Sequence, residues 1–125
     1  MSFAAVLRTV VEECGGGIGA ALMGNDGIPI EQFTLEGRAG ADGSEFDVDT
    51  AGVEFGRILE DIRKTFDSLA GGLVEETIVR GARFSLVFRT VDEENFLIVA
   101  VEPDGNLGKA RYLIRRHMLA IRSEL

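Results

Sequence analysis

The sequence predicts an α+β fold, in which a five-stranded antiparallel sheet carries helices on both faces. Three observations lead to this prediction. Residues 96–101 form an unbroken apolar run with the length of a strand that is buried on both faces. Helical apolar periodicity precedes, divides and follows the strand segments, which gives the order αββαβββα. Short turns join neighbouring strand segments, and strands joined by short turns run antiparallel.

The chain has 125 residues, enough for one domain with one core and too few for two ordinary domains. Neither an internal repeat nor a linker interrupts it. We therefore expect residues 1–125 to form a single domain.

The first expected element is a helix that Ser2 can cap and that ends at the glycines of residues 15–17. Its apolar side chains recur at helical spacing: Phe3, Val6, Leu7, Val10 and Cys14. Because Cys14 belongs to this stripe, we expect a small buried hydrophobe and not a reactive thiol.

A hairpin follows, with strands at residues 18–23 and 28–35. The Gly, Asn and Asp residues of the turn at 24–27 tolerate the positive φ that hairpin turns need. Pro29 has no N–H to donate, so it should stand near the start of a strand or on a sheet edge.

A polar stretch at residues 36–47, glycine-rich at 37–44, predicts a loop. A long helix then begins at a cap, Asp47 or Asp49, and continues to about Ala70. Its apolar positions predict a buried stripe: Ala51, Phe55, Ile58, Leu59, Ile62, Phe66 and Leu69.

Two further sets of residues on the long helix are candidates for contacts. Two helix-interior glycines each cost about 1 kcal/mol relative to alanine, and a close approach by another helix, internal or from a second subunit, would use them. The flank that holds them is Gly52, Gly56, Leu59 and Arg63. On the opposite face, four positions are expected to be solvated: Val53, Arg57, Glu60 and Lys64.

Three more strands complete the sheet, at residues 73–80, 82–90 and 96–101. Gly81 and the turn at 91–94 separate them. A final helix, capped by Asn106 or Asp104, can fold back over the sheet. Its apolar arc is Leu107, Ala110, Ile114, Met118, Ile121 and Leu125.

The net charge of −8 argues against non-specific attraction of the whole molecule to DNA or anionic lipid. The charge is uneven, because residues 1–79 hold 5 basic and 15 acidic residues and residues 80–125 hold 8 basic and 6 acidic. The cations of the final helix are either a solvated face favoured by the helix dipole or a docking surface for an acidic partner. They are Lys109, Arg111, Arg115, Arg116 and Arg122.

A single cysteine excludes an internal disulfide. No apolar run approaches the ~18 residues that a membrane-spanning helix needs. The N-terminus shows no signal-peptide pattern. We therefore expect a cytoplasmic protein without membrane insertion. The absence of tryptophan and of a basic–aromatic face argues against nucleic-acid binding.

Motifs for chemistry are missing. The glycines at 15–20 follow a helix and precede a strand, the reverse of a dinucleotide-binding order. The stretch 105–110 lacks both the first glycine and the Ser/Thr of a phosphate loop. His117, the one histidine, has no ligand or base at a useful spacing and is expected to be structural. We therefore expect no enzyme activity, no catalytic residues, no cofactor and no metal.

Two segments together resemble the roadblock family of dynein light chains and its MglB-like bacterial branch. One is residues 26–30, DGIPI, followed by the long helix and the strand at 73–80. The other is residues 96–101 followed by Pro103 and the sequence through Arg111. The resemblance covers nearly the entire chain, and the order and spacing of its motifs are more specific than any one of them.

The resemblance implies a fold with the long helix on one face of the sheet and the two terminal helices on the other. It also implies a homodimer in which the long helices lie side by side and the strands after them pair edge to edge. The interface residues would be Gly52, Gly56, Leu59, Arg63, Leu73, Val74, Thr77 and Val79.

The resemblance further implies binding to a small Ras-like GTPase, as MglB-like proteins bind an MglA-like partner in cell polarity or gliding motility. Such proteins stimulate GTP hydrolysis by remodelling the GTPase and insert no arginine finger. The paired long helices would present the partner-binding positions, Val53, Arg57, Glu60 and Lys64, which are assigned by helix phase. The alternatives are an adaptor of the same fold without effect on hydrolysis and a small-ligand sensor.

Overall fold

The computed structural model describes residues 2–35 and 47–125, so the expected glycine-rich loop at 37–44 lies outside the described residues. Its elements are α1 (Phe3–Glu13), β1 (Gly17–Gly24), β2 (Pro29–Thr34), α2 (Val48–Ser68), β3 (Glu76–Arg80), β4 (Ser85–Thr90), β5 (Asn95–Val101), α3 (Leu107–Arg116) and α4 (Met118–Glu124).

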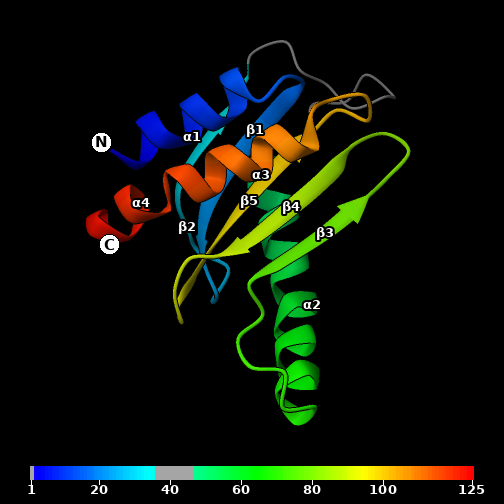
Figure 1. Cartoon of the computed structure of the whole chain (residues 1–125). Coiled ribbons are helices and arrows are strands. Elements are labelled where there is room, and N and C mark those ends of the chain that lie inside the picture. The colour runs from blue at the N-terminus through cyan, green and yellow to red at the C-terminus, as the bar shows by residue number, and fades with distance from the viewer. Residues whose placement is uncertain (1, 36–46) are drawn as a thin grey trace.

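The strands form one antiparallel sheet in the order β2-β1-β5-β4-β3. The helix α2 covers one face, and α1, α3 and α4 cover the other (Figure 1). This arrangement confirms the predicted fold class. It also places β2 and β3 at the two edges, and Pro29 is the first residue of an edge strand, as predicted.

Two cores form because the side chains of the central strands alternate between the two faces. Leu22 and Val99 pack under α1 and α3, in the core that also encloses Cys14. Met23 and Ile98 pack under α2. Burial raises the pKa of the Cys14 thiol above its usual value, so this cysteine is a buried hydrophobe, as predicted.

The helix ends follow the sequence signals. Ser2 Oγ accepts a hydrogen bond from the N–H of Ala5 at 3.2 Å. The Asp47 carboxylate accepts from the N–H of Asp49 at 3.0 Å and from Thr50 Oγ1 at 2.8 Å. Asn106, the predicted alternative to Asp104, accepts from the N–H of Lys109 at 2.9 Å. These bonds satisfy N–H groups that have no partner within the helix.

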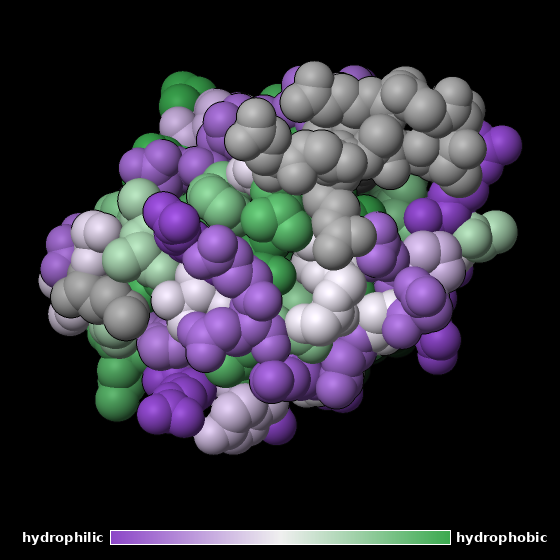
Figure 2. Space-filling view, turned by 90° about the horizontal axis from the view of Figure 1, so that it is seen from above, coloured by the Kyte–Doolittle hydropathy of each residue, from purple (hydrophilic) through white to green (hydrophobic). Residues whose placement is uncertain are grey.

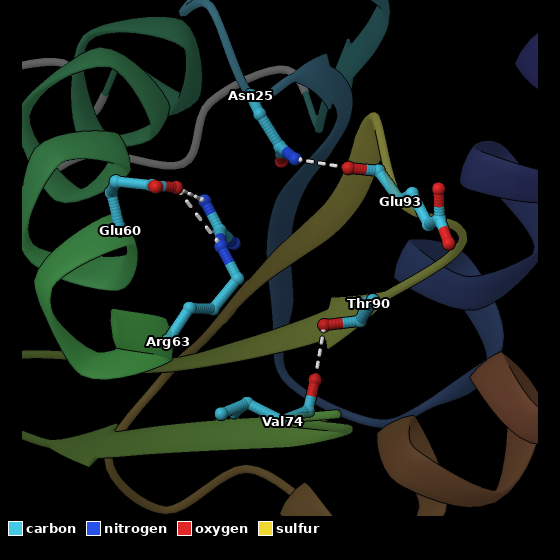
Figure 3. A network of polar contacts seen from close by, with 6 residues as sticks. All are labelled: Asn25, Glu60, Arg63, Val74, Thr90 and Glu93. Carbon is cyan, nitrogen blue, oxygen red and sulfur yellow. Dashed lines mark hydrogen bonds and ion pairs between the residues drawn. The ribbon is translucent and has the colours of Figure 1, made fainter. Parts of the chain in front are cut away.

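Several predicted boundaries were wrong. The strand expected at 73–80 begins at Glu76, and the one expected at 82–90 begins at Ser85, because the ladder between β3 and β4 extends only from Glu76 to Arg80. The preceding segment is held by β4 without a ladder: Thr90 Oγ1 donates to the Val74 carbonyl at 2.6 Å (Figure 3).

The final helix is also divided, which the sequence pattern did not indicate. His117 leaves the helical conformation at φ −98° and ψ 5°, separating α3 from α4. Ile114, Met118 and Ile121, on the two sides of the break, all remain in one core. His117 itself is half-buried at the break.

The predicted buried stripe of α2 was half wrong. Its buried residues, Val48, Gly52, Gly56 and Leu59, lie in the first part of the helix. The second part extends beyond the end of the sheet (Figure 1). Ile58, at the middle of the helix, is 50% exposed, and Phe66 and Leu69, at its C-terminal end, are 42% and 73% exposed. The stripe is amphipathic throughout, but the sheet is too short to cover it.

The described residues include no helix with the length and apolarity needed to cross a bilayer. Seen from above, the described surface is mostly hydrophilic, and its hydrophobic residues form small groups (Figure 2). Large exposed apolar side chains of α2 include Val53, Ile58 and Phe66, and others lie outside this helix.

Candidate interaction surface

An open groove of about 560 Å³ lies between the second half of α2 and the segment that leads into β3. Ile62 and Phe66 line it from α2, and Leu73, Val74 and Thr77 line it from the other side. Glu75 and Glu76 also line the groove, and the Glu76 carboxylate binds Arg111 of α3. We call these lining residues the α2–β3 groove.

Exposed apolar side chains continue from the groove in both directions. Leu69 is 73% exposed and Leu73 is 60% exposed at the end of α2, and Val79 on β3 is 40% exposed. Thr77 and Val79 stand opposite Phe88 and Leu86, two residues of the core under α2, so they face the side of the sheet that α2 covers. The apolar surface is therefore continuous across two elements.

The strand β3 adds polar recognition to this apolar surface. It pairs with β4 on one side, and within the described residues no strand pairs with its other side. The N–H and C=O groups of that free side can receive another strand. An apolar groove beside an open strand edge is a surface suited to association with a second chain.

Local backbone geometry holds the groove in place. Ala70 adopts φ 58° and Gly72 φ 79°, so the chain reverses directly after α2. The N–H of Gly71 donates to the Phe66 carbonyl at 2.9 Å, and a Cβ at Gly71 would lie 2.4 Å from the Phe66 ring. Gly71 therefore allows the Phe66 ring to pack against the reversed chain. An ion pair of 2.8 Å between Arg111 and Glu76 fixes the start of β3 to α3.

The solvent face of α2 is a second candidate surface. Val53, Arg57, Glu60 and Lys64 are all exposed, as predicted from helix phase. Arg57 contacts Glu54 at 3.4 Å, and Glu60 accepts from Arg63 at 2.9 Å (Figure 3). Exposed pairs of this kind contribute little to stability, so these side chains are free to rearrange around a partner.

The structure separates the two halves of the predicted dimer interface. Leu73, Val74, Thr77 and Val79 lie in or beside the α2–β3 groove. Gly52, in contrast, faces β1, and a Cβ there would lie 2.8 Å from Met23. Leu59 is only 4% exposed and belongs to the core under α2. Gly52 and Leu59 therefore serve packing within the chain.

The other two residues of the glycine flank make no comparable contact with the sheet, although Gly56 is itself buried. No atom lies within 4 Å of a Cβ built on Gly56. The Arg63 side chain is 20% exposed and bound to Glu60. On the side of α2 towards β3, the groove is lined by Ile62 and Phe66 and not by the glycine flank. The sequence contained a signal for them, because α2 spans about 31 Å while a seven-residue strand such as β5 spans about 23 Å.

Comparison with known proteins identifies structures of the same fold. MglC from Myxococcus xanthus is 34% identical, with 100% of both chains covered and a TM-score of 0.69. A Roadblock/LC7 domain from Streptomyces avermitilis is 15% identical, with 99% of this chain and 98% of that chain covered and a TM-score of 0.81. The gliding protein MglB from Thermus thermophilus is 18% identical, with coverages of 95% and 84% and a TM-score of 0.81. No family model and no curated protein sequence matches the chain.

Proposed function

Since this chain belongs to the roadblock family, we propose that it is a homodimeric regulator that binds a small Ras-like GTPase and modulates its GTP hydrolysis. The setting would be cell polarity or gliding motility, because the chain shares its fold with the gliding protein MglB. The observation that carries the proposal is the α2–β3 groove, an uncovered apolar surface beside an open strand edge.

The dimer part of the proposal rests on exposed side chains. Leu73 and Leu69 are more than half exposed, and covering them with a second chain removes apolar surface from water. The free edge of β3 supplies backbone hydrogen bonds to the same strand of a second copy, antiparallel about a twofold axis. A second chain on this surface would cover the exposed leucines and the free edge of β3 at the same time.

The GTPase part rests on the solvent face of α2. This face carries Val53 among charged side chains, and the packing of α2 on its own sheet leaves it free. In a dimer built through the groove, two copies of α2 would present a doubled surface. A partner would thereby contact Val53, Arg57, Glu60 and Lys64 from both protomers.

A GTPase titration tests the proposal. The chain is mixed with a Ras-like GTPase from the same organism, loaded with GTP, and both complex formation and single-turnover phosphate release are measured. A complex with altered turnover supports regulation. The absence of a complex contradicts the proposal. The double variant Arg57→Glu and Lys64→Glu should abolish the complex, whereas Arg83→Glu, an exposed charge reversal in the β3–β4 loop, should not.

The adaptor alternative makes a different prediction in the same assay. A scaffold would form the complex and leave the rate of phosphate release unchanged. That result would keep the interaction surface on α2 and remove the effect on hydrolysis from the proposal.

A further inference from the structure

We propose that the outward surface of α3 and α4 docks an acidic segment of a partner protein, in which carboxylates flank an apolar side chain. We call this surface the α3–α4 patch and define it by Tyr112, Arg115, Arg116 and Leu119. It lies on the layer opposite α2 (Figure 1), so its partner does not compete with a partner of α2.

The first argument is charge. The sequence of α3, LGKARYLIRR, contains four basic residues and no acidic residue, although the whole chain has a net charge of −8. The helix dipole favours cations in the last turn, which accounts for the placement of Arg115 and Arg116 on the helix. It does not account for a cationic surface in a chain that is otherwise acidic.

The second argument is that the cations of the patch are unused within the chain. Arg111 on the same helix binds Glu76 at 2.8 Å, and Arg122 on α4 donates to the Val91 carbonyl at 2.9 Å. In the described ranges, Arg115 and Arg116 contact no carboxylate. Arg116 instead donates to the Tyr112 hydroxyl at 3.4 Å. Two exposed guanidinium groups are therefore available to a partner.

The third argument is the apolar component. Tyr112 is 49% exposed and Leu119 is 80% exposed. Tyr112 lies one turn before Arg116, and Leu119 follows Arg115 and Arg116 by three or four residues. In sequence, the two cations thus lie between two exposed apolar residues, Tyr112 on α3 and Leu119 on α4. Aromatic and arginine side chains are the residue types enriched at protein interfaces.

The same features select a protein over a lipid surface or a nucleic acid. A net charge of −8 repels an extended polyanion, whereas a short acidic segment experiences mainly the local field within a Debye length of about 8 Å. The exposed Leu119 side chain gives a peptide apolar area to cover and gives the phosphate backbone of a nucleic acid nothing to bind, whereas it is the net charge that disfavours a lipid surface. The patch therefore fits an amphipathic acidic segment.

The test uses the full chain and a fluorescent synthetic peptide with leucine at helical spacing and glutamate on both sides. Fluorescence anisotropy measures binding at two salt concentrations, and amide chemical shifts locate the contact. We expect shifts at the patch and an affinity that falls with salt. The variant Arg115→Glu/Arg116→Glu should bind about tenfold more weakly, the sum of two small exposed ion pairs. The control Arg83→Glu should bind within about twofold of the unmodified chain, as expected for a charge far from the contact.

A charge-swapped peptide, with lysine in place of glutamate, makes the test independent of folding. It should bind the Arg115→Glu/Arg116→Glu variant better than the unmodified chain, which a merely destabilised variant would not do. Equal binding of both peptides, or shifts that map away from α3 and α4, would overturn the proposal. Tighter binding at the patch to phosphatidylserine vesicles or to a DNA duplex would likewise overturn the assignment to a protein partner.

Discussion

Two glycines four residues apart on α2 show how differently the same residue type can act. Gly52 lies against Met23, whose side chain is fully buried, and Gly56 has open space where a Cβ would stand. Both carry the same intrinsic cost in a helix interior, about 1 kcal/mol relative to alanine. Only Gly52 gains internal packing in return.

The two glycines can be compared directly by substitution. Gly56→Ala should raise the free energy of unfolding by up to about 1 kcal/mol, because the added methyl group meets nothing in the chain. Gly52→Ala should instead lower the free energy of unfolding. Overpacking against Met23 costs about 1–3 kcal/mol, which outweighs the gain in helix propensity. Urea unfolding of both variants measures the difference. Equal effects would contradict the assigned packing of Gly52.

The cap of α2 contains two carboxylates with opposite shifts. The hydrogen bond from the Thr50 side chain, foremost among several, lowers the pKa of Asp47. Burial, followed by the charge of Asp47, raises the pKa of Asp49. The ionised form of Asp47 therefore stabilises the fold above the usual pKa of an aspartate, and this contribution is lost as the pH falls through the lowered value. Because the pKa of Asp49 is raised, ionisation of its carboxyl lowers the stability of the fold as the pH rises.

Replacing the cap tests this assignment. Asp47→Ala should reduce the free energy of unfolding by about 1 kcal/mol at neutral pH, the usual value of an N-terminal cap. The difference from the unmodified chain should shrink as the pH falls below the usual pKa of an aspartate and through the lowered pKa of Asp47, since the carboxyl is then protonated in both states. Asp47→Asn keeps an oxygen acceptor and should cost less. A pH-independent loss for Asp47→Ala would contradict the ionic part of the cap.

The long helix α2 has one apolar stripe with two parts, one that packs on the sheet and one that lines the α2–β3 groove. Its first half is covered by β1, β2 and β5, and its second half extends past the sheet into the α2–β3 groove. The apolar stripe was predictable from the sequence, but the sequence did not show which part the sheet would cover. Periodicity identifies a face and says nothing about the molecule that covers it.

The groove can be disrupted without touching the core. Leu73→Lys should weaken self-association at least about tenfold, because the variant places a charge in an apolar contact. Ile28→Lys is the matched control. Ile28 is 62% exposed, close to the 60% of Leu73, but it lies beside β2, at the opposite edge of the sheet. Sedimentation equilibrium of the three proteins measures the change. An effect of Ile28→Lys equal to that of Leu73→Lys would move the interface to β2.

For the whole molecule, the sheet order predicts a gradient of stability. The strands β1 and β5 are paired on both sides and buried on both faces. The strand β3 has one pairing partner among the described strands, and its last three residues are exposed. Local opening is easiest where few buried contacts hold the backbone.

Amide hydrogen exchange tests this gradient. Amides of β1 and β5 should exchange slowest, and those of β3 and the last turns of α2 fastest, in a dilute sample. Raising the protein concentration should slow exchange in β3 selectively if β3 pairs with a second copy. Protection of β3 that is high and independent of concentration would contradict the open edge.

Much of this architecture could be predicted because its signals are local. The apolar run at 96–101, the caps Ser2 and Asp47, and the turn at 24–27 all act through near neighbours in sequence. The division at His117 and the split of the interface residues depend on how far one layer extends over another. Those distances arise from tertiary packing, which no short window of sequence contains.

The position of β1 in the sheet has a consequence for synthesis of the protein. The strand β1 is made early, yet its second neighbour, β5, ends at Val101. Asn25 is likewise tied to the Glu93 carbonyl at 2.7 Å, a residue that follows it by 68 positions. A nascent chain therefore carries one unpaired side of β1 until the residues through Val101 have left the ribosome. During translation, a chaperone that covers the first hairpin would protect this unpaired side of β1.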